Sequence, residues 1–169
     1  MKKLAIAVAA TLALIASGHS AAATSTGTIL VNANVVSSCV VTAVPLAFGI
    51  YDGTSNADKT ASTPVVLICA GTSTAVLTMD NGQNSSTTRR MKNAAGTEFL
   101  SYGLFQPVSN TPLAACAYTT PFGSTTAEGL SIIGIGLVAQ TFNVCGSIPK
   151  GQNVGFGVYT DSVTVTATF

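Results

Sequence analysis

Hydrophobic and polar positions alternate most strictly over the last eleven residues of this chain, from Tyr159 to Phe169. Small or apolar side chains fall on one face and hydroxyl side chains on the other, with the period of two that a half-buried β-strand requires. The apolar face consists of Val163, Val165, Ala167 and Phe169. Because a strand's backbone donors and acceptors cannot stay buried and unmatched, this segment is expected to pair with another strand.

A second alternating segment lies near the other end of the chain. Its apolar face consists of Ile29, Val31, Ala33 and Val35, and Leu30 is the exception to the pattern. No charged residue occurs between Thr24 and Phe48, so a free arm of this kind would be sticky and poorly soluble. Two interpretations stay open: an ordinary first strand within its own sandwich, or a strand offered to a neighbouring molecule.

Short apolar runs separated by turn residues fill the sequence between these ends. They predict strands at Thr28–Val36, Cys39–Phe48, Pro64–Cys69, Ala75–Met79, Leu100–Phe105, Leu130–Val138 and Val158–Phe169. Asp80-Asn81-Gly82 directly after an apolar run is a hairpin signal. No segment sustains a period of 3.6 residues, so helix should be minor. The pattern favours an all-β chain folded as a β-sandwich.

The first 23 residues have the features of a secretory signal peptide. Lys2 and Lys3 precede an apolar run from Leu4 to Ala16, and small residues at 21–23 suit a cleavage site. A membrane anchor is the alternative, but this run is shorter than the roughly 20 residues that a crossing needs. The run from Leu130 to Ala139 is also short and contains two glycines, so no stable membrane insertion is expected.

Charge and residue types argue against several functions. Without Lys2 and Lys3 the chain has five basic and six acidic residues, 5 − 6 = −1, which gives no electrostatic reason to expect nucleic acid as a partner. Arg89, Arg90 and Lys92 form the one basic cluster and are expected to be solvated. The single histidine, His19, lies within the signal peptide, which removes the commonest general base and metal ligand. We expect no enzyme, no cofactor and no metal.

The four cysteines predict disulfides, because an even number in an exported protein is typical of a disulfide framework. They are Cys39, Cys69, Cys116 and Cys145, and they contain no close C-x-x-C pair of the kind that metal sites use. Three connectivities are possible. The sequential one, Cys39–Cys69 and Cys116–Cys145, is favoured, and each bond would stabilise the fold by about 3–4 kcal/mol on the chain-entropy estimate.

Landmarks across most of the chain resemble those of a known family. They are Cys39 after the alternating arm, Phe48-Gly49 with Tyr51, Cys69-Ala70-Gly71, Asp80 with Gly82, Arg90-Met91, Leu100 to Phe105, and Gly157-x-Tyr159-x-Asp161-x-Val163-x-Val165. In this order they resemble the spore coat protein U-like subunits of archaic, Csu-type chaperone–usher pili. The ending Ala167-Thr168-Phe169 lacks the penultimate tyrosine of type 1 and P pilins, which favours the archaic branch.

The resemblance implies an incomplete immunoglobulin-like β-sandwich that is completed by donor-strand exchange. In such proteins a periplasmic chaperone first fills an apolar groove, and the arm of the next pilus subunit replaces it at an outer-membrane usher. The donor face would then be Ile29, Val31, Ala33 and Val35. The face of Val163, Val165, Ala167 and Phe169 would line the groove or contact the chaperone.

The predicted organisation is a signal peptide at 1–23, a donor-strand arm at 24–38 and a pilin domain at 39–169. The predicted function is that of a structural subunit of a surface pilus, exported through the periplasm to the cell surface and serving adhesion and biofilm formation. A single domain of this length suits a shaft or minor subunit. The alternative is a self-complete secreted β-sandwich that binds a sugar or protein ligand.

Overall fold

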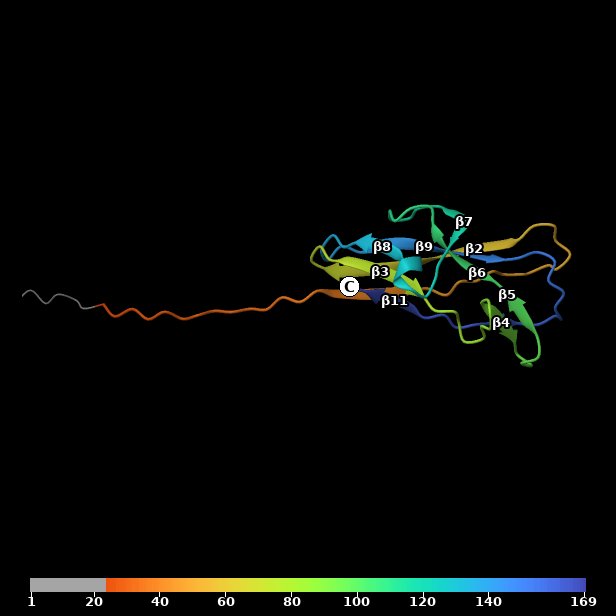
Figure 1. Cartoon of the computed structure of the whole chain (residues 1–169), viewed down its shortest axis with the longest axis horizontal. Helices are drawn as coiled ribbons and strands as arrows, with labels where there is room; N and C mark the ends of the chain where they lie inside the picture. The colour runs from red at the N-terminus through yellow and green to blue at the C-terminus, as the bar shows by residue number, and fades with distance from the viewer. Residues whose placement is uncertain (1–23) are drawn as a thin grey trace, which may run out of the picture. The chain divides into compact units, whose positions relative to one another are not determined.

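Antiparallel strands form three sheets in the chain, whose computed structural model describes residues 24–169 (Figure 1). The signal peptide predicted at 1–23 lies outside these residues. The strands are β1 (Ser38–Ala43), β2 (Lys59–Ala70), β3 (Thr74–Met79), β4 (Arg90–Asn93), β5 (Phe99–Ser101), β6 (Gly103–Pro107), β7 (Cys116–Pro121), β8 (Leu130–Ile133), β9 (Gln140–Ile148), β10 (Tyr159–Thr160) and β11 (Val165–Thr168). One 3-10 turn, Thr126–Glu128, is the sole helical element of the described part, as expected.

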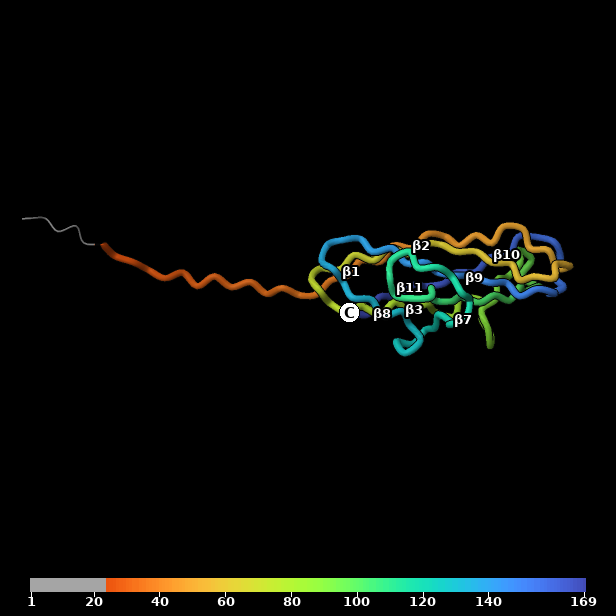
Figure 2. The backbone as a smooth tube through the Cα atoms, turned by 90° about the horizontal axis from the view of Figure 1, so that it is seen from above, coloured from red at the N-terminus to blue at the C-terminus, as the bar shows by residue number. Residues whose placement is uncertain are grey.

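The largest sheet has five strands in the order β1-β2-β9-β6-β7. A second sheet has the order β11-β3-β8, and a third the order β10-β4-β5. The tube view shows β2 and β9 running along the domain (Figure 2). Contacts divide the chain into one unit that ends at Asn34 and another from Val35 to Phe169.

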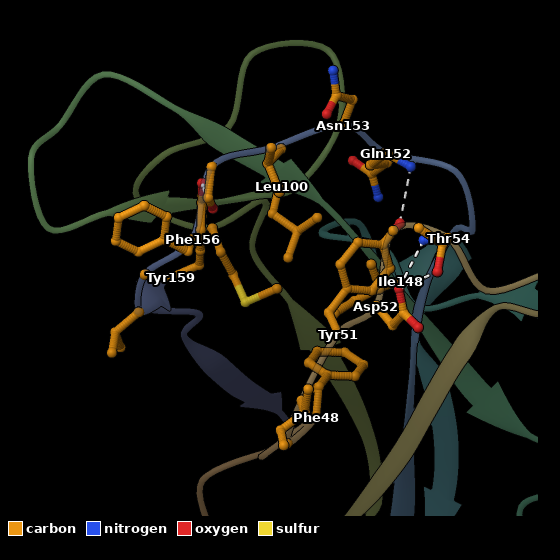
Figure 3. A pocket seen from close by; sticks show the side chains of 18 of the residues that line it. Phe48, Tyr51, Asp52, Thr54, Leu100, Ile148, Gln152, Asn153, Phe156 and Tyr159 are labelled. Atoms are coloured by element: carbon orange, nitrogen blue, oxygen red, sulfur yellow. Dashed lines mark hydrogen bonds between the residues drawn. The ribbon is translucent and has the colours of Figure 1, made fainter.

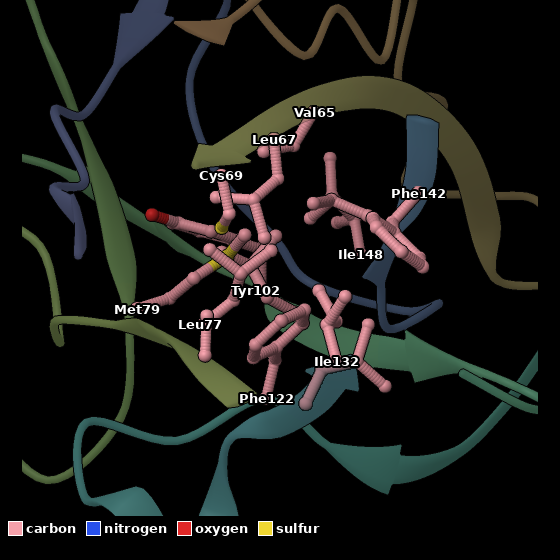
Figure 4. Close-up of a cluster of buried hydrophobic side chains, with 14 of the residues drawn as sticks. Val65, Leu67, Cys69, Leu77, Met79, Tyr102, Phe122, Ile132, Phe142 and Ile148 are labelled. Carbon is pink, nitrogen blue, oxygen red and sulfur yellow. The ribbon is translucent and has the colours of Figure 1, made fainter. Parts of the chain in front are cut away.

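The core lies between the first two sheets and explains why their strands alternate. Val65 and Leu67 of β2 and Leu77 and Met79 of β3 are almost completely buried, whereas Val66 between the first two is only half-buried. Figure 4 shows these side chains packed with aromatic and aliphatic residues of other segments, including Phe122 directly after β7, Ile132 on β8 and Phe142 on β9. Burying each large apolar side chain contributes about 1.5–3 kcal/mol. The predicted all-β sandwich is confirmed.

The two disulfides of the structure follow the sequential pairing. Cys39 and Cys69 lie directly opposite each other in the β1–β2 register, so their bond joins an edge strand to its neighbour. Cys116 on β7 bonds to Cys145 on β9, on the two sides of β6. Within the part of the chain that the structure describes, no cysteine is free.

Several predicted strands are shorter than expected, for identifiable reasons. Cys39–Phe48 ends as a strand at Ala43, because Pro45 has no backbone N–H to donate. Leu130–Val138 ends at Ile133, after which the N–H groups of Gly134 and Gly136 donate to loop carbonyls. Leu100–Phe105 and Val158–Phe169 are each divided between two sheets.

Two other expectations were wrong. Thr28–Val36 forms no strand, since residues 24–37 have no pairing partner in the structure. Asp80-Asn81-Gly82 forms no hairpin, because the strands on its two sides, β3 and β4, belong to different sheets. The sequence pattern also missed β4, β7 and the central strand β9.

Candidate functional site

Two neighbouring strands from different sheets, β1 and β11, each have an edge without a partner. Among the described residues, β1 pairs only with β2, and β11 pairs only with β3. The two strands belong to different sheets, yet they lie close to each other. An edge strand presents a row of unpaired N–H and C=O groups that can pair with another chain. The region between β1 and β11 therefore offers two hydrogen-bonding edges to one added strand.

An apolar groove continues from this region. It consists of two adjoining cavities, of about 440 Å³ and 1040 Å³. Both are lined by Leu46, Phe48, Met91 and Tyr159, so the two cavities lie side by side along the same walls. Core residues form the floor of the smaller cavity: Val65, Met79, Leu104 and Val144. A groove with an apolar floor accommodates apolar side chains better than a charged ligand.

One wall of the groove is the segment after β1, residues 44–54. The Thr63 hydroxyl donates to the carbonyl of Val44 (2.9 Å), where the pairing of β1 has ended. Leu46 and Phe48 then approach β9 at Gly146 so closely that a Cβ there would lie 2.5 Å from Leu46 Cδ2 and 2.7 Å from Phe48 Cζ. Gly146 is needed for this approach, because any side chain would displace the wall.

The second wall is the segment from Gly151 to Val165. Near its middle, the Tyr159 hydroxyl lies 2.9 Å from both the Glu98 carboxylate and the Gly155 carbonyl. Burial and the hydrogen bond to Glu98 raise the pKa of Tyr159, so its hydroxyl stays protonated at neutral pH. Figure 3 shows Leu100 between the walls, with Tyr51 on one side and Phe156 on the other.

Asp161 holds the second wall to the rest of the domain. Its carboxylate accepts hydrogen bonds from the Tyr102 hydroxyl (2.7 Å) and from the backbone and side-chain N–H groups of Asn84 (3.2 and 3.0 Å). Burial, with the hydrogen bond to Asp161, raises the pKa of Tyr102 far above its ordinary value. The Tyr102 hydroxyl is therefore a permanent donor, and Asp161 positions the chain just before β11.

Asp80 makes a similar connection at the start of β11. Its carboxylate accepts the N–H of Gly82 (2.9 Å) and the N–H of Thr164 (3.0 Å). Burial alone would raise the pKa of Asp80, but these hydrogen bonds, together with the nearby Arg89, hold it below its ordinary value. The ionised carboxylate therefore stabilises the groove wall.

Acid should weaken the fold through Asp80. Because its folded pKa is lower than its unfolded pKa, the carboxylate's contribution is fully present above about pH 4 and is lost as the pH falls through the folded value. We expect the free energy of unfolding, measured with urea, to fall more steeply below about pH 4 for the unaltered chain than for Asp80→Asn. Equal slopes for the two proteins would contradict this role.

The basic cluster differs from the sequence expectation. Arg89 is partly buried and donates from Nε to the Asp80 carbonyl and from Nη2 to the carbonyls of Met79 and Phe122, all at 2.8 Å. Burial lowers the pKa of Arg89. The expected solvated cluster was wrong for this residue, which cross-links the end of β3. The Arg90 guanidinium lies 4.0 Å from the centre of the Phe99 ring.

The residues predicted to act in strand exchange fall into two groups: those of the C-terminal segment lie mostly at the groove or the core, and those of the arm are exposed. Val163 and Val165 line the groove, and Ala167 packs against the core, whereas Phe169 is about half exposed. The predicted donor residues are all exposed and belong to no strand: Ile29, Val31, Ala33 and Val35. Their role as a donor strand stays a prediction.

Sequence reasoning assigned no role to the first wall or to the contacts of Asp161. Phe48, Tyr51, Tyr102 and Asp161 were noted among the landmarks of the resemblance, and that was the only signal available for them. Over residues 24–169, no helix is long and apolar enough to cross a membrane. The same residues contain no group of three or more His, Cys, Asp or Glu side chains able to hold a metal ion.

Comparisons with known proteins show a family match and a shared fold. A family model described as Spore Coat Protein U domain matches residues 25–166. Protein U of Myxococcus xanthus is 36% identical over 185 residues, covering all of this chain and 98% of that protein. A solved structure, the CsuC–CsuE chaperone–tip adhesion subunit pre-assembly complex from archaic chaperone–usher Csu pili of Acinetobacter baumannii, matches with a TM-score of 0.52 and 24% identity. That match covers 80% of this chain and 40% of the other, and at this identity it shows a shared fold alone.

Proposed function

Because the chain belongs to the spore coat protein U family, we propose that it is a structural subunit of a surface pilus assembled by a chaperone–usher pathway. One observation carries the proposal: a groove of two adjoining cavities with an apolar floor begins between two unpaired strand edges, β1 and β11. A self-contained sandwich has no need of such a groove, and leaving it empty keeps half-buried apolar side chains such as Phe48 and Met91 in contact with water.

A strand from another molecule is the occupant that best matches the groove. It would pair with both edges and place every second side chain on the apolar floor, as in the strand addition known for chaperone–pilin complexes. Ile29, Val31, Ala33 and Val35 supply such a face. Burying three β-branched side chains at about 1.5–3 kcal/mol each, and Ala33 at less, yields several kcal/mol before the backbone hydrogen bonds are counted.

Head-to-tail insertion of this kind does not close on itself and therefore builds a filament. The partners in our proposal are other subunits of the pilus, a periplasmic chaperone that protects the groove before assembly, and an outer-membrane usher. The similar solved structure is itself a complex of a chaperone with a tip subunit, which supports the chaperone. Export through a signal peptide, surface display, adhesion and biofilm formation complete the proposal.

Removing the arm tests this function. We expect the exported full-length chain to form polymers that resist SDS and migrate as a ladder, because a completed sandwich dissociates only by losing a whole buried strand. A version of the mature chain that begins at Ser37 should form no ladder. Two soluble monomers of equal stability would contradict the proposal and favour a complete sandwich that binds a sugar or protein ligand.

A further inference from the structure

One end of the domain is apolar and carries no charged side chain. Three loops gather there: residues 71–73 between β2 and β3, residues 134–139 after β8, and residues 108–115 between β6 and β7. The N–H groups of Gly136 and Gly134 donate to the carbonyls of Gly71 and Ser73, both at 2.9 Å, and the N–H of Leu113 donates to the Thr141 carbonyl at 2.8 Å. We call this surface the uncharged end.

The uncharged end displays large apolar side chains on an ordered backbone. Leu137 is 80% exposed, and Ile133, Ile135, Val138 and Leu113 are each more than half exposed. The loop that carries most of them is fixed by the two glycine hydrogen bonds and by buried Gln140, whose Nε2 donates to the Ile133 carbonyl at 3.0 Å. The apolar patch is therefore held in one arrangement in the isolated domain.

The distribution of charge separates this end from the rest of the domain. No residue of the ranges 60–79, 99–127, 129–149 or 162–169 is charged, and these ranges contain all three loops. Charged side chains lie at the opposite end instead, where the N–H of Lys150 donates to Asp58 and its Nζ donates to the Asn56 carbonyl. An ordered apolar surface without charged side chains is typical of an interface that another protein covers.

The position of the start of β1 indicates which molecule covers the uncharged end. Ser38, the first residue of β1, lies opposite Ala70 beside the 71–73 loop, and the tube view places β1 and the C-terminus at the same end of the domain (Figure 2). Only Val36 and Ser37 separate Ser38 from Val35, the last donor residue. Three residue steps span at most about 11 Å. A copy whose groove holds Val35 must therefore lie against the uncharged end.

From these observations we infer that the uncharged end docks on the far end of the neighbouring copy's groove, making a second contact between consecutive subunits. This inference rests on the proposed function. An arm antiparallel to β11 would place Val35 at the end of the groove lined by residues 49–54 and 151–158. Ile50 (87%) and Phe156 (105%) are exposed there, which provides an apolar counter-surface. An arm parallel to β11 would instead place Val35 at the uncharged end of the acceptor, where the acceptor's own arm also leaves the domain. Two chain segments would then occupy the same place.

Photo-crosslinking tests the inference directly. With p-benzoylphenylalanine replacing Leu137, assembled fibres should give a crosslink between position 137 of one copy and residues 49–54 or 151–158 of another. The chaperone-bound subunit of the same variant should give none to a second copy. Crosslinks confined to one chain, or to other surfaces of the neighbour, would overturn the inference. Absence of an SDS-resistant ladder from the unaltered chain would instead overturn the proposed function.

A charge at the same position provides a second test. Leu137→Lys should leave the SDS-resistant ladder intact but abolish the regular subunit repeat seen by electron microscopy. Thr119→Lys, an exposed substitution on β7, is the matched control and should keep the repeat. An unchanged repeat in Leu137→Lys would overturn the inference. The inference would also be overturned if fibres of Leu137→Lys kept their repeat but no longer attached to an apolar surface, because the patch would then face outward.

Discussion

Moving the arm to the other end of the chain should convert the domain into a stable monomer. We expect a version that begins at Ser37 and carries residues 26–36 after Phe169, joined by a short turn containing Asn-Gly, to melt at least about 10 °C above the version without the added segment. Because β11 ends beside the start of β1, the added segment can turn back and pair between the free edges of β1 and β11. The chain would then complete its own sandwich. Differential scanning calorimetry of both versions measures the change.

The size of this effect follows from the side chains that the groove would bury. Three β-branched side chains and one alanine contribute several kcal/mol, and about 1 kcal/mol shifts the melting temperature of a domain of this size by several degrees. The control version carries Ile29→Asp and Val31→Asp in the added segment. If this control melted at the same temperature as the version with the unaltered added segment, the stabilisation would come from the extra chain rather than from apolar side chains in the groove.

The core strands were predictable because their alternation is a local signal. Val65, Leu67 and Cys69 are buried at every second position of β2, and the sequence shows this pattern without knowledge of any partner. The central strand β9 was missed for the opposite reason. It lies between two neighbours, and its buried positions include Gln140, Gly146 and Ser147, so that the hydrophobic alternation is broken.

The groove could not be predicted in detail, because its walls are fixed by contacts between distant residues. The Tyr51 hydroxyl donates to the Pro149 carbonyl, 98 residues away, and Tyr102 donates to Asp161, 59 residues away. Neither wall has the period of a strand over its full length. Resemblance marked these residues as landmarks, and the structure supplies their physical roles.

Replacing a single apolar donor side chain with a charged one should block polymerisation. We expect Val31→Asp to reduce the SDS-resistant ladder of the full-length chain at least tenfold, measured by unheated gel electrophoresis. In the proposed complex, Val31 is at the middle of the donor face and would contact the apolar groove floor. A carboxylate there would be desolvated without a partner, which costs more than burial of the native side chain contributes. The chaperone-bound subunit should stay soluble, since its own groove is unchanged.

Asn32→Asp is the matched control, because it adds the same charge one residue away on the opposite face of the arm. Successive side chains of a strand point to opposite faces, so Asp at position 32 should stay in water and leave the ladder intact. A ladder lost in Asn32→Asp but kept in Val31→Asp would mean that the register is shifted by one residue and that the other face enters the groove. A ladder kept in both variants would mean that this arm is not the inserted strand. The pair therefore distinguishes an error in the donor face from an error in the donor segment.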